Sequence, residues 1–309
     1  MTDESNLRRS PSARGGRRSF LALLLVLLAV LAVMALLIGA PFFLAGGGRD
    51  RLRGEGVGVV EMEGVLLSPN AILKQLVRYR SDDRVRAVLL RIDSPGGGVA
   101  ATQEIYWEVL RTRRTKKVVA SLGSVAASGG LYVAAAADRV VASPGTLTGS
   151  ISVIMHVGNY EELFHKIGLK SVVIKSGEFK DIGSPWREMT GREKEILQKL
   201  VKNMHDQFVR DVAQGRGLPV ERVAALADGR VFTGQEAVQL GLVDELGNFE
   251  DAVALAGKLA GLKGRPNLIY ERQERFRWWD LLLGRSQSRQ ISDWLAHPMR
   301  IQYLYAPGL

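Results

Sequence analysis

The stretch from Phe20 to Leu44 contains no charged residue and constrains the chain more than any other feature. As an α-helix it would reach about 37 Å, enough to cross the hydrocarbon core of a bilayer with some tilt. The apolar core of a cleaved signal peptide is normally only about 7 to 15 residues long. We therefore favour an uncleaved transmembrane helix at residues 20–44, preceded by a basic arm at residues 1–19.

The charges on either side of this stretch predict its orientation. The positive-inside rule keeps a basic cluster in the cytoplasm, and five arginines precede the stretch: Arg8, Arg9, Arg14, Arg17 and Arg18. Three further arginines on the other flank weaken this asymmetry: Arg49, Arg51 and Arg53. The sequence still favours a single-pass protein whose remaining residues lie on the extracytoplasmic side of the membrane.

The net charge of +10 does not indicate nucleic-acid binding. Much of the excess comes from the N-terminal arm and from residues 263–309, and the long middle of the chain is nearly balanced. No segment there carries a basic stripe with interleaved aromatic residues, so we expect no nucleic-acid partner. The absence of cysteine excludes disulfides, thiol nucleophiles and cysteine-ligated zinc.

After a linker at residues 45–55, short apolar runs alternate with longer periodic segments up to residue 262. This alternation is typical of βα units around a largely parallel sheet, so we expect an α/β domain at residues 56–262. The expected strands are Val57–Met62, Val85–Ile92, Lys117–Ser121, Val140–Ala142 and Ile151–Met155. Five helices are expected. The first starts after Ser68, the second follows the glycine run and ends near Arg114, and the third is short and ends at Ala137. The last two span Thr190–Gln214 and Asn248–Leu259.

The turn after the second expected strand reads Asp93-Ser94-Pro95-Gly96-Gly97-Gly98. A glycine run after a strand leaves backbone N–H groups unshielded, which suits the binding of an oxyanion. A phosphate loop would continue with Gly-Lys-Ser/Thr and a dinucleotide loop would have the spacing GxGxxG, and neither pattern is present. The remaining alternative to an oxyanion site is a simple tight turn.

Ser128 is the candidate nucleophile. Its neighbours, Ala126-Ala127 and Gly129-Gly130, are small enough to permit a sharp strand-to-helix turn that presents the hydroxyl at its tip. Ser121 and Ser124 lack such neighbours on both sides. The competing interpretation is that Ser128 caps the helix that follows.

A nucleophilic serine needs a base, and the sequence offers two kinds. The histidines are scattered along the chain: His156, His165, His205 and His297. Lys175 and Lys180 are the nearby lysines, and a lysine acts as a base only when burial or a like charge lowers its pKa well below about 10.4. The residues alone do not distinguish between these candidates.

Five motifs follow one another between Val57 and Gly261, and together they resemble a known family. They are Asp93-Ser94-Pro95-Gly96-Gly97-Gly98, Ala126-Ala127-Ser128-Gly129-Gly130, Leu147-Thr148-Gly149-Ser150, Lys175-Ser176-Gly177 through Lys180-Asp181-Ile182, and Gly229-Arg230-Val231-Phe232-Thr233-Gly234 to Gly241-Leu242-Val243-Asp244. In this order the motifs resemble the signal peptide peptidase SppA, or protease IV, family in its short single-domain form.

The resemblance implies a ClpP/crotonase-like α/β domain with a Ser/Lys catalytic dyad. By motif position, Ser128 matches the nucleophile and Lys180 matches the general base. Gly97 and the N–H of Gly129 match the oxyanion hole, and Ser150 matches a hydroxyl that helps to hold the lysine. The choice between the two lysines rests on this resemblance alone.

The resemblance also implies a function and a location. We expect a serine endopeptidase anchored in the bacterial inner membrane, with its catalytic domain on the periplasmic side. It would cleave apolar peptides, in particular remnant signal peptides after their release from preproteins, in a homo-oligomeric ring whose active sites are shared between protomers. No motif implies a cofactor or a metal ion.

Three other functions stay open. Crotonase-like chemistry on acyl-CoA would use the same glycine loop but needs the cytosolic side of the membrane. A catalytically silent membrane scaffold would need Ser128 only as a helix cap, and a protease could instead act on a stomatin-like membrane partner.

Residues 263–309 form a basic extension rich in tryptophan. Arg275-Phe276-Arg277-Trp278-Trp279 lies beside Leu281-Leu282-Leu283, a combination that suits a helix at a membrane surface. The alternative is that the extension packs on its own domain or on a neighbouring protomer. We expect no catalytic role for it.

Overall fold

The computed structural model describes residues 23–34, 54–271 and 300–305. These residues belong to two units, Met1–Gly54 and Glu55–Leu309. In the first unit, residues 23–34 form a helix, and the other positions of the expected span at 20–44 lie outside the described residues. Among the described residues, no helix combines the length and the apolar character that a membrane span requires.

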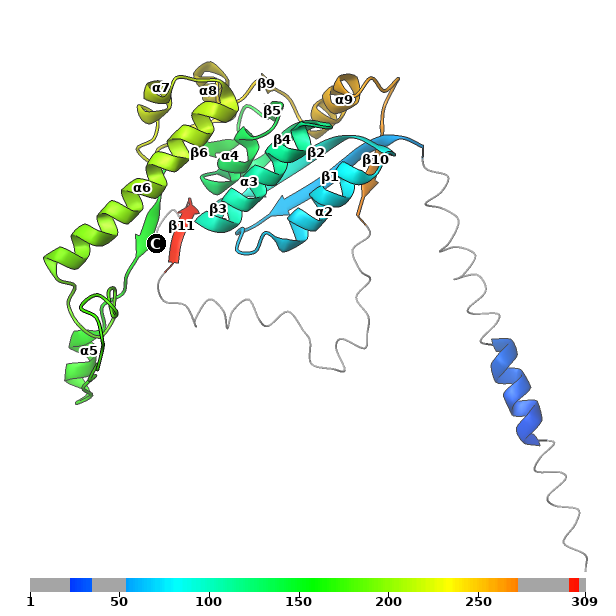
Figure 1. Ribbon diagram of the computed structural model, residues 1–309. Helices are drawn as coiled ribbons and strands as arrows, with labels where there is room; N and C mark the ends of the chain where they lie inside the picture. The colour runs from blue at the N-terminus through cyan, green and yellow to red at the C-terminus, as the bar shows by residue number, and fades with distance from the viewer. Residues whose placement is uncertain (1–22, 35–53, 272–299, 306–309) are drawn as a thin grey trace, which may run out of the picture. The chain divides into compact units, whose positions relative to one another are not determined.

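The described part of the second unit is built on a largely parallel sheet (Figure 1). Its main path runs in the order β10 (Asn267–Tyr270), β1 (Gly56–Glu63), β2 (Val85–Ser94), β4 (Lys117–Ala127), β5 (Arg139–Ala142) and β9 (Glu245–Leu246). Two more strands lie off this path, because β6 (Leu147–Gly149) pairs with the end of β4 and β8 (Val231–Thr233) pairs with β6. Only the pair of β6 and β8 is antiparallel in this sheet of described strands.

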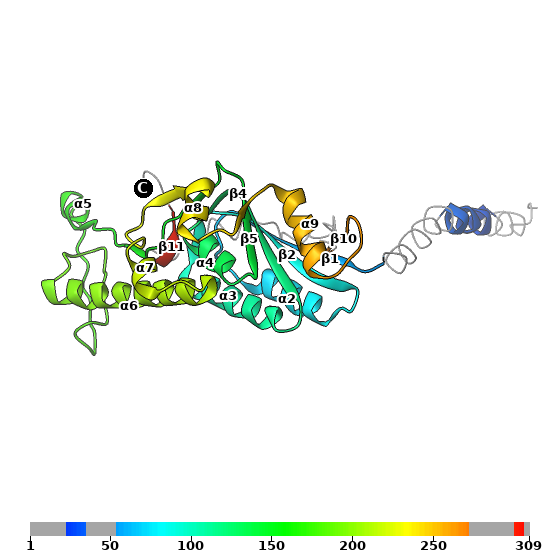
Figure 2. The ribbon, with the colours of Figure 1, turned by 90° about the horizontal axis from the view of Figure 1, so that it is seen from above.

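Helices cover both faces of the sheet (Figure 2). Leu90 in β2 belongs to the larger apolar core, which includes residues of α2 (Asn70–Ser81), α3 (Val99–Arg113), α4 (Gly129–Ala135) and α6 (Gly191–Arg216). Leu89, on the opposite face of β2, belongs to a smaller core with α9 (Phe249–Leu259). Burial on both faces explains why β2 is a nearly continuous apolar run. Three shorter helices complete the described part of this unit: α5 (Glu161–Lys166), α7 (Val220–Ala224) and α8 (Gly234–Leu240).

The ends of several elements follow from local chemistry. Thr190 and Asn248 begin α6 and α9 with capping boxes, as the sequence predicts for helices that start at these residues. β4 is longer than expected, because its second half pairs with β6 and carries the chain through Ala127. The strand expected at Ile151–Met155 pairs only from Ile154 onward, as β7 (Ile154–His156).

A second, three-stranded sheet joins distant parts of the chain. It has the order β3 (Gly96–Gly98), β11 (Arg300–Leu304) and β7, and both of its pairings are antiparallel. β10 and β11 both come from the expected extension at 263–309, so these two pieces pack on their own unit. Residues 272–299, which include the Arg- and Trp-rich segment, lie outside the described residues.

Candidate active site

Ser128 occupies the sharp turn between β4 and α4. Its φ of 52° and ψ of −115° lie outside the usual regions for a residue with a side chain. Its N–H donates to the carbonyl of Gly149 at 2.8 Å, which ties the turn to the end of β6. A non-glycine residue with positive φ is held there by its surroundings, and such residues are common at functional sites. The sequence prediction of a sharp strand-to-helix turn at Ser128 is confirmed.

The Ser128 hydroxyl is buried and lacks a hydrogen-bond partner. Ser128 is 1% exposed, and its Oγ makes no hydrogen bond to any other residue that the structure describes. It stands at the N-cap position of α4, but its side chain makes no capping bond. Buried hydroxyls are normally paired, so the helix-cap interpretation does not account for this serine.

Two glycines after Ser128 allow the glycine loop to approach. A Cβ on Gly129 would come within 2.8 Å of Thr102 and 3.1 Å of the Gly97 nitrogen. A Cβ on Gly130 would come within 2.8 Å of the Ser94 carbonyl oxygen. The lack of a side chain at both positions therefore brings Ser128 beside the backbone N–H groups of the loop.

The glycine loop is fixed from both sides. The Ser94 hydroxyl, which is fully buried, donates to the Gly64 carbonyl at 2.6 Å and accepts from the Gly96 N–H at 3.1 Å. A Cβ on Gly97 would lie 2.1 Å from the Leu66 carbonyl oxygen, so the segment that follows β1 packs directly against the loop. Gly97 and Gly129, the two residues expected to form the oxyanion hole, lie together beside Ser128.

Ser150 lies directly after the residue that holds the Ser128 turn. Like Ser128 it has a φ of 52°, and these two are the non-glycine residues with positive φ in the described ranges. Its N–H donates to the Arg230 carbonyl at 2.7 Å, and it is 6% exposed. The motifs around Ser128, Ser150 and Arg230 are thus brought together by β4, β6 and β8.

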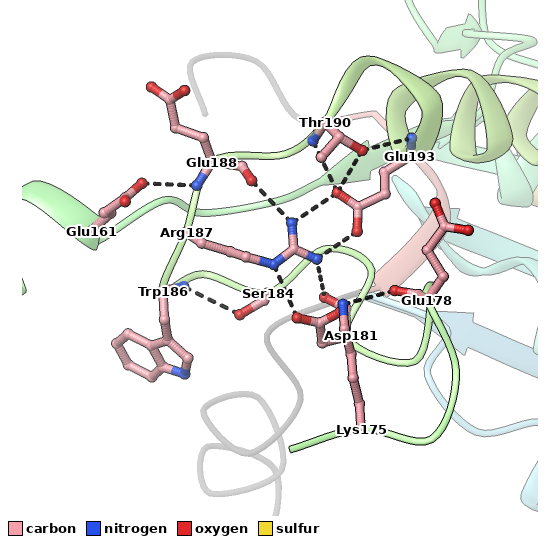
Figure 3. A network of polar contacts seen from close by, with 10 residues as sticks. All are labelled: Glu161, Lys175, Glu178, Asp181, Ser184, Trp186, Arg187, Glu188, Thr190 and Glu193. Carbon is pink, nitrogen blue, oxygen red and sulfur yellow. Dashed lines mark hydrogen bonds and ion pairs between the residues drawn. The ribbon is translucent and has the colours of Figure 1, made fainter. Parts of the chain in front are cut away.

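Lys175, the first candidate lysine, is engaged in an ion pair (Figure 3). Its Nζ donates to Asp181 at 2.5 Å and to the Glu178 carbonyl at 2.7 Å. Arg187, and after it Lys175, hold the pKa of Asp181 well below its usual value by donating hydrogen bonds to the carboxylate. These two contacts hold the Lys175 Nζ within its own segment, which leaves it less available to act as a base for Ser128.

Lys180 lies in an exposed turn of the same segment. Its backbone N–H donates to the Gly177 carbonyl at 3.2 Å, and its side chain makes no hydrogen bond or ion pair with the residues described. The structure of the single chain does not bring Lys180 within hydrogen-bonding distance of the Ser128 hydroxyl. The pairing of these two residues therefore stays a prediction.

The three histidines that the structure describes are not brought to Ser128 either. His205 lies with its Nε2 2.7 Å from the Ala227 carbonyl oxygen, and His156 and His165 are exposed. His297 lies outside the described residues.

An aromatic cluster behind the Ser128 turn was not predicted from the sequence. The ring centroids of Tyr132, Phe208 and Tyr303 lie 4.5 to 5.3 Å apart, and the Tyr106 ring lies 4.8 Å from that of Tyr132, tilted by 41°. Burial raises the pKa of Tyr132 and of Tyr303, so both phenols stay protonated and donate hydrogen bonds, to Asp211 and to the Met204 carbonyl respectively. Nothing in the local sequence around Tyr303 indicates that it is buried, because its neighbours in space lie about 100 residues or more away.

Comparison with protein families agrees with the motifs. The chain matches the sequence model of peptidase family S49 over residues 111–263 and that of the Clp protease family over residues 67–147. The Clp match agrees with the expected ClpP/crotonase-like domain. A ClpP1 mutant from Listeria monocytogenes is 19% identical, with a TM-score of 0.43, and the match covers 63% of this chain and 93% of that one.

Curated relatives carry protease names. A protein of Synechocystis sp. named as a protease is 48% identical over 205 residues, which are 66% of this chain and 74% of that protein. A protein of Enterococcus faecium named for signal peptide peptidase SppA is 39% identical, and the match covers 59% of this chain and 53% of the relative. Protease 4 of Salmonella typhi is 38% identical, with coverage of 61% and 31%. The chain thus spans most of the first relative and about half or less of the other two.

Proposed function

Since the chain belongs to peptidase family S49, serine peptidases of the signal peptide peptidase type, we propose that it is a membrane-anchored endopeptidase whose nucleophile is Ser128. The observation that carries this proposal is the buried Ser128 hydroxyl, which has no hydrogen-bond partner among the described residues and lies beside Gly97 and Gly129. A strained turn and a hydroxyl that makes no other hydrogen bond are both features expected of a nucleophilic serine.

The reaction follows from these positions. The neutral amine of Lys180 would take the Ser128 proton while Oγ bonds to the carbonyl carbon of a peptide. The N–H groups of Gly97 and Gly129 would stabilise the negative oxygen of the tetrahedral intermediate. The lysine would then give the proton to the leaving amine, and water would release the acyl group from Ser128.

We place the lysine on a neighbouring protomer. Within one chain the Ser128 hydroxyl has no hydrogen-bond partner among the described residues, and Lys180 is exposed. A ring in which each Ser128 faces the Lys180 of a neighbouring protomer would therefore complete the site. Ser150, next to the residue that anchors the Ser128 turn, would help to hold the incoming lysine. Assembly would then be a condition of activity.

The substrates we propose are apolar peptides, in particular remnant signal peptides. The uncharged stretch from Phe20 to Leu44 and the arginines before it support an anchor that would place the enzyme at the membrane where such peptides remain. A protease that acts on a membrane protein partner would use the same catalytic residues.

The test is cleavage of a synthetic signal peptide by the detergent-solubilised full chain. Ser128→Ala and Lys180→Ala should each lower kcat by about 10³-fold or more, because each removes a group on which the covalent step depends. Co-expression of the two variants should restore activity, since roughly a quarter of the sites in a mixed ring would receive an intact serine and an intact lysine. Lys175→Ala is the matched control and should keep most of the activity.

Each result has a definite meaning. Loss in both single variants without recovery on co-expression would keep the dyad and reject the shared site. Loss in Lys175→Ala with full activity in Lys180→Ala would reject the base assignment. If Ser128→Ala cleaves the peptide as well as the wild type does, the protease mechanism is wrong and a scaffold role takes its place.

A further inference from the structure

A pocket of about 610 Å³ lies at the N-terminal ends of the parallel strands, away from the candidate active site. Lys117, the first residue of β4, lines this pocket, whereas Ser128 directly follows the last residue of the same strand. β1 and β2 begin at the same edge, where Gly56 pairs with Val85 (Figure 1). The eleven residues of β4 span roughly 33 Å, so the pocket is separate from the Ser128 turn.

The lining of the pocket carries an excess of positive charge. Five of its side chains are basic and only two are acidic, Glu55 and Asp83. The basic side chains belong to Arg86, Arg113, Arg114, Lys116 and Lys117. Leu259 and Ala260, at the end of α9, add an apolar wall. A pocket of this size and composition suits a small ligand that joins an anionic group to an apolar one.

The ion pairs around the pocket neutralise only part of this charge. Arg113 and Lys117 share the single carboxylate of Asp138, at 3.5 and 3.7 Å. The exposed Arg114 guanidinium makes no hydrogen bond or ion pair with the residues that the structure describes. Arginine and lysine donors that protein groups leave unused are available to a phosphate group.

Lys116 binds backbone carbonyls instead of a carboxylate. Its Nζ donates to the Tyr79 carbonyl at 2.6 Å and to the Asp82 carbonyl at 2.5 Å. Partial burial lowers the pKa of Lys116, and the nearby carboxylates of Asp82 and Asp83 oppose this shift only in part. Cations are favourable here because α2 and α3 both end at this edge. The helix ends explain why cations gather, but they leave the Arg114 donors unused.

The pocket lies where the second unit follows the N-terminal part of the chain. Glu55, which accepts a hydrogen bond from Arg86 at 2.9 Å, is the first residue of that unit. In the sequence only ten residues separate Glu55 from Leu44, the end of the uncharged stretch, and this linker reaches at most about 40 Å. If the stretch is the membrane anchor proposed above, the linker keeps the pocket within reach of lipid headgroups.

We propose that this pocket binds the phosphate headgroup of an anionic membrane lipid. Arg114 and Lys117 would donate to the phosphate oxygens, and Leu259 and Ala260 would contact the glycerol and the first carbons of the acyl chains. Cations close to an anionic bilayer surface are attracted to it, and the anchor would keep the lipid at a high local concentration. The inference rests on the anchor of the proposed function but not on the catalytic role of Ser128.

The test measures how far bilayers of different headgroups shield the pocket. The chain contains no cysteine, so Thr115→Cys introduces a single thiol at an exposed position of the lining. The full chain is placed in nanodiscs of phosphatidylcholine alone, or of equal parts phosphatidylcholine and phosphatidylglycerol, and labelled with an uncharged, water-soluble maleimide. Labelling should be at least about fivefold slower with phosphatidylglycerol, because a bound headgroup covers the thiol. Lys170→Cys, which is exposed and outside the pocket, should show no such difference.

Matched double variants separate the pocket from general surface charge. In the Thr115→Cys background, Arg114→Gln with Lys117→Gln should weaken lipid binding by about tenfold or more and remove most of the protection. Arg210→Gln with Lys74→Gln also removes one arginine and one lysine, both exposed and outside the pocket, and should keep the protection. Arg114→Gln alone should fold like the wild type, since its side chain has no described partner, and should lose part of the protection.

Several outcomes would overturn the inference. Equal labelling in the two lipid compositions would show that the linker alone brings the pocket to the bilayer. Loss of protection in the Arg210 and Lys74 double variant to the same extent would indicate a general charge effect. If inorganic phosphate or glycerol 3-phosphate protects the thiol equally well in phosphatidylcholine nanodiscs, the ligand is a free phosphate compound and the lipid assignment is wrong.

The experiment also distinguishes this inference from the proposed function. A full chain that does not insert into nanodiscs would reject both the anchor and the lipid site. Peptide cleavage by the detergent-solubilised chain tests Ser128 independently of either, so a failed lipid site leaves the proposed peptidase standing.

Discussion

Ser94 and Ser128 are both buried serines, yet their hydroxyl groups have different surroundings. The Ser94 hydroxyl bonds to the Gly64 carbonyl and to the Gly96 N–H, whereas the Ser128 hydroxyl has no hydrogen bond to a described residue. A buried hydroxyl without a partner costs stability. The first serine thus shapes the glycine loop, whereas the second keeps its hydroxyl unpaired among the described residues, as the proposed nucleophilic role needs.

Two adjacent glycines of that loop differ in how much space surrounds them. A Cβ on Gly97 would lie 2.1 Å from the Leu66 carbonyl oxygen, while the nearest atom to a Cβ on Gly98 is 3.8 Å away. We predict that Gly97→Ala displaces the loop and lowers kcat by about 10²-fold or more, because it moves an oxyanion donor. Gly98→Ala should keep at least about half of the activity.

The measurement is peptide hydrolysis by the two variants, together with their thermal unfolding midpoints. Equal activity in Gly97→Ala and Gly98→Ala would show that the loop at Gly97 takes no part in catalysis. A large loss in Gly98→Ala would show that the loop cannot accept even a methyl group with open space around it.

At the scale of elements, an ion-pair network fixes the segment that carries Lys180. Arg187 donates to Asp181 at 2.9 Å and to Glu193 at 2.8 Å, and Glu193 also closes the capping box at the start of α6 (Figure 3). The Arg187 guanidinium thus ties the segment that contains Asp181 to the first turn of α6. We regard Arg187 as a positioning residue for Lys180.

This network predicts a dependence on pH. Hydrogen bonds from Arg187, and then from the Thr190 N–H, lower the pKa of Glu193 from 4.5 to about 2. A carboxyl group with a lowered pKa stabilises the fold above its unfolded pKa, and this stabilisation is lost as the pH falls through the folded value. The difference in urea midpoint between the wild type and Arg187→Ala should therefore be full well above pH 4.5 and shrink steadily as the pH falls toward 2, with the part that comes from Asp181 lost last.

Arg192→Ala is the control for this prediction. Arg192 pairs with Glu178 at 3.3 Å, but both side chains are mostly exposed, and such pairs contribute little. Arg187→Ala should also lower kcat at neutral pH more than Arg192→Ala does. A pH-independent difference in midpoint would contradict an electrostatic role for Arg187.

Elements with strong local patterns could be predicted from the sequence, and those defined by distant partners could not. β1, β2 and β5 are apolar runs, and α6 and α9 begin at capping residues, so their positions agree with prediction. β6, β8 and β11 are only three to five residues long and depend on strands far along the chain. Short strands of this kind have no periodicity of their own to detect.

The candidate site divides in the same way. The small residues around Ser128 and the glycine run predict a turn and an exposed backbone, because these requirements are local. The ion pair with Asp181 distinguishes Lys175 from Lys180. It depends on how a segment without regular strands or helices folds. The burial of Tyr303 depends on contacts with α4 and α6, so no local sequence pattern predicts it.

At the scale of the whole molecule, the absence of cysteine makes the membrane orientation testable. A single cysteine introduced as Lys170→Cys, at an exposed position of the second unit, should react with a membrane-impermeant maleimide in intact spheroplasts. Ser12→Cys in the basic arm should react only after lysis, because the arginines around it favour a cytoplasmic arm. The wild type gives the background.

The opposite labelling pattern would invert the topology and favour a cytosolic activity for the domain. Labelling of both cysteines in intact spheroplasts would mean that the first unit does not span the membrane.

The position of β11 between β3 and β7 also bears on solubility. Without β11, each of these strands would present a row of unpaired N–H and C=O groups, and such edges are templates for pairing with other chains. If β11 detached, both edges would be open to other chains until another strand covered them. In the described structure β11 therefore covers two strand edges that could otherwise pair with other chains.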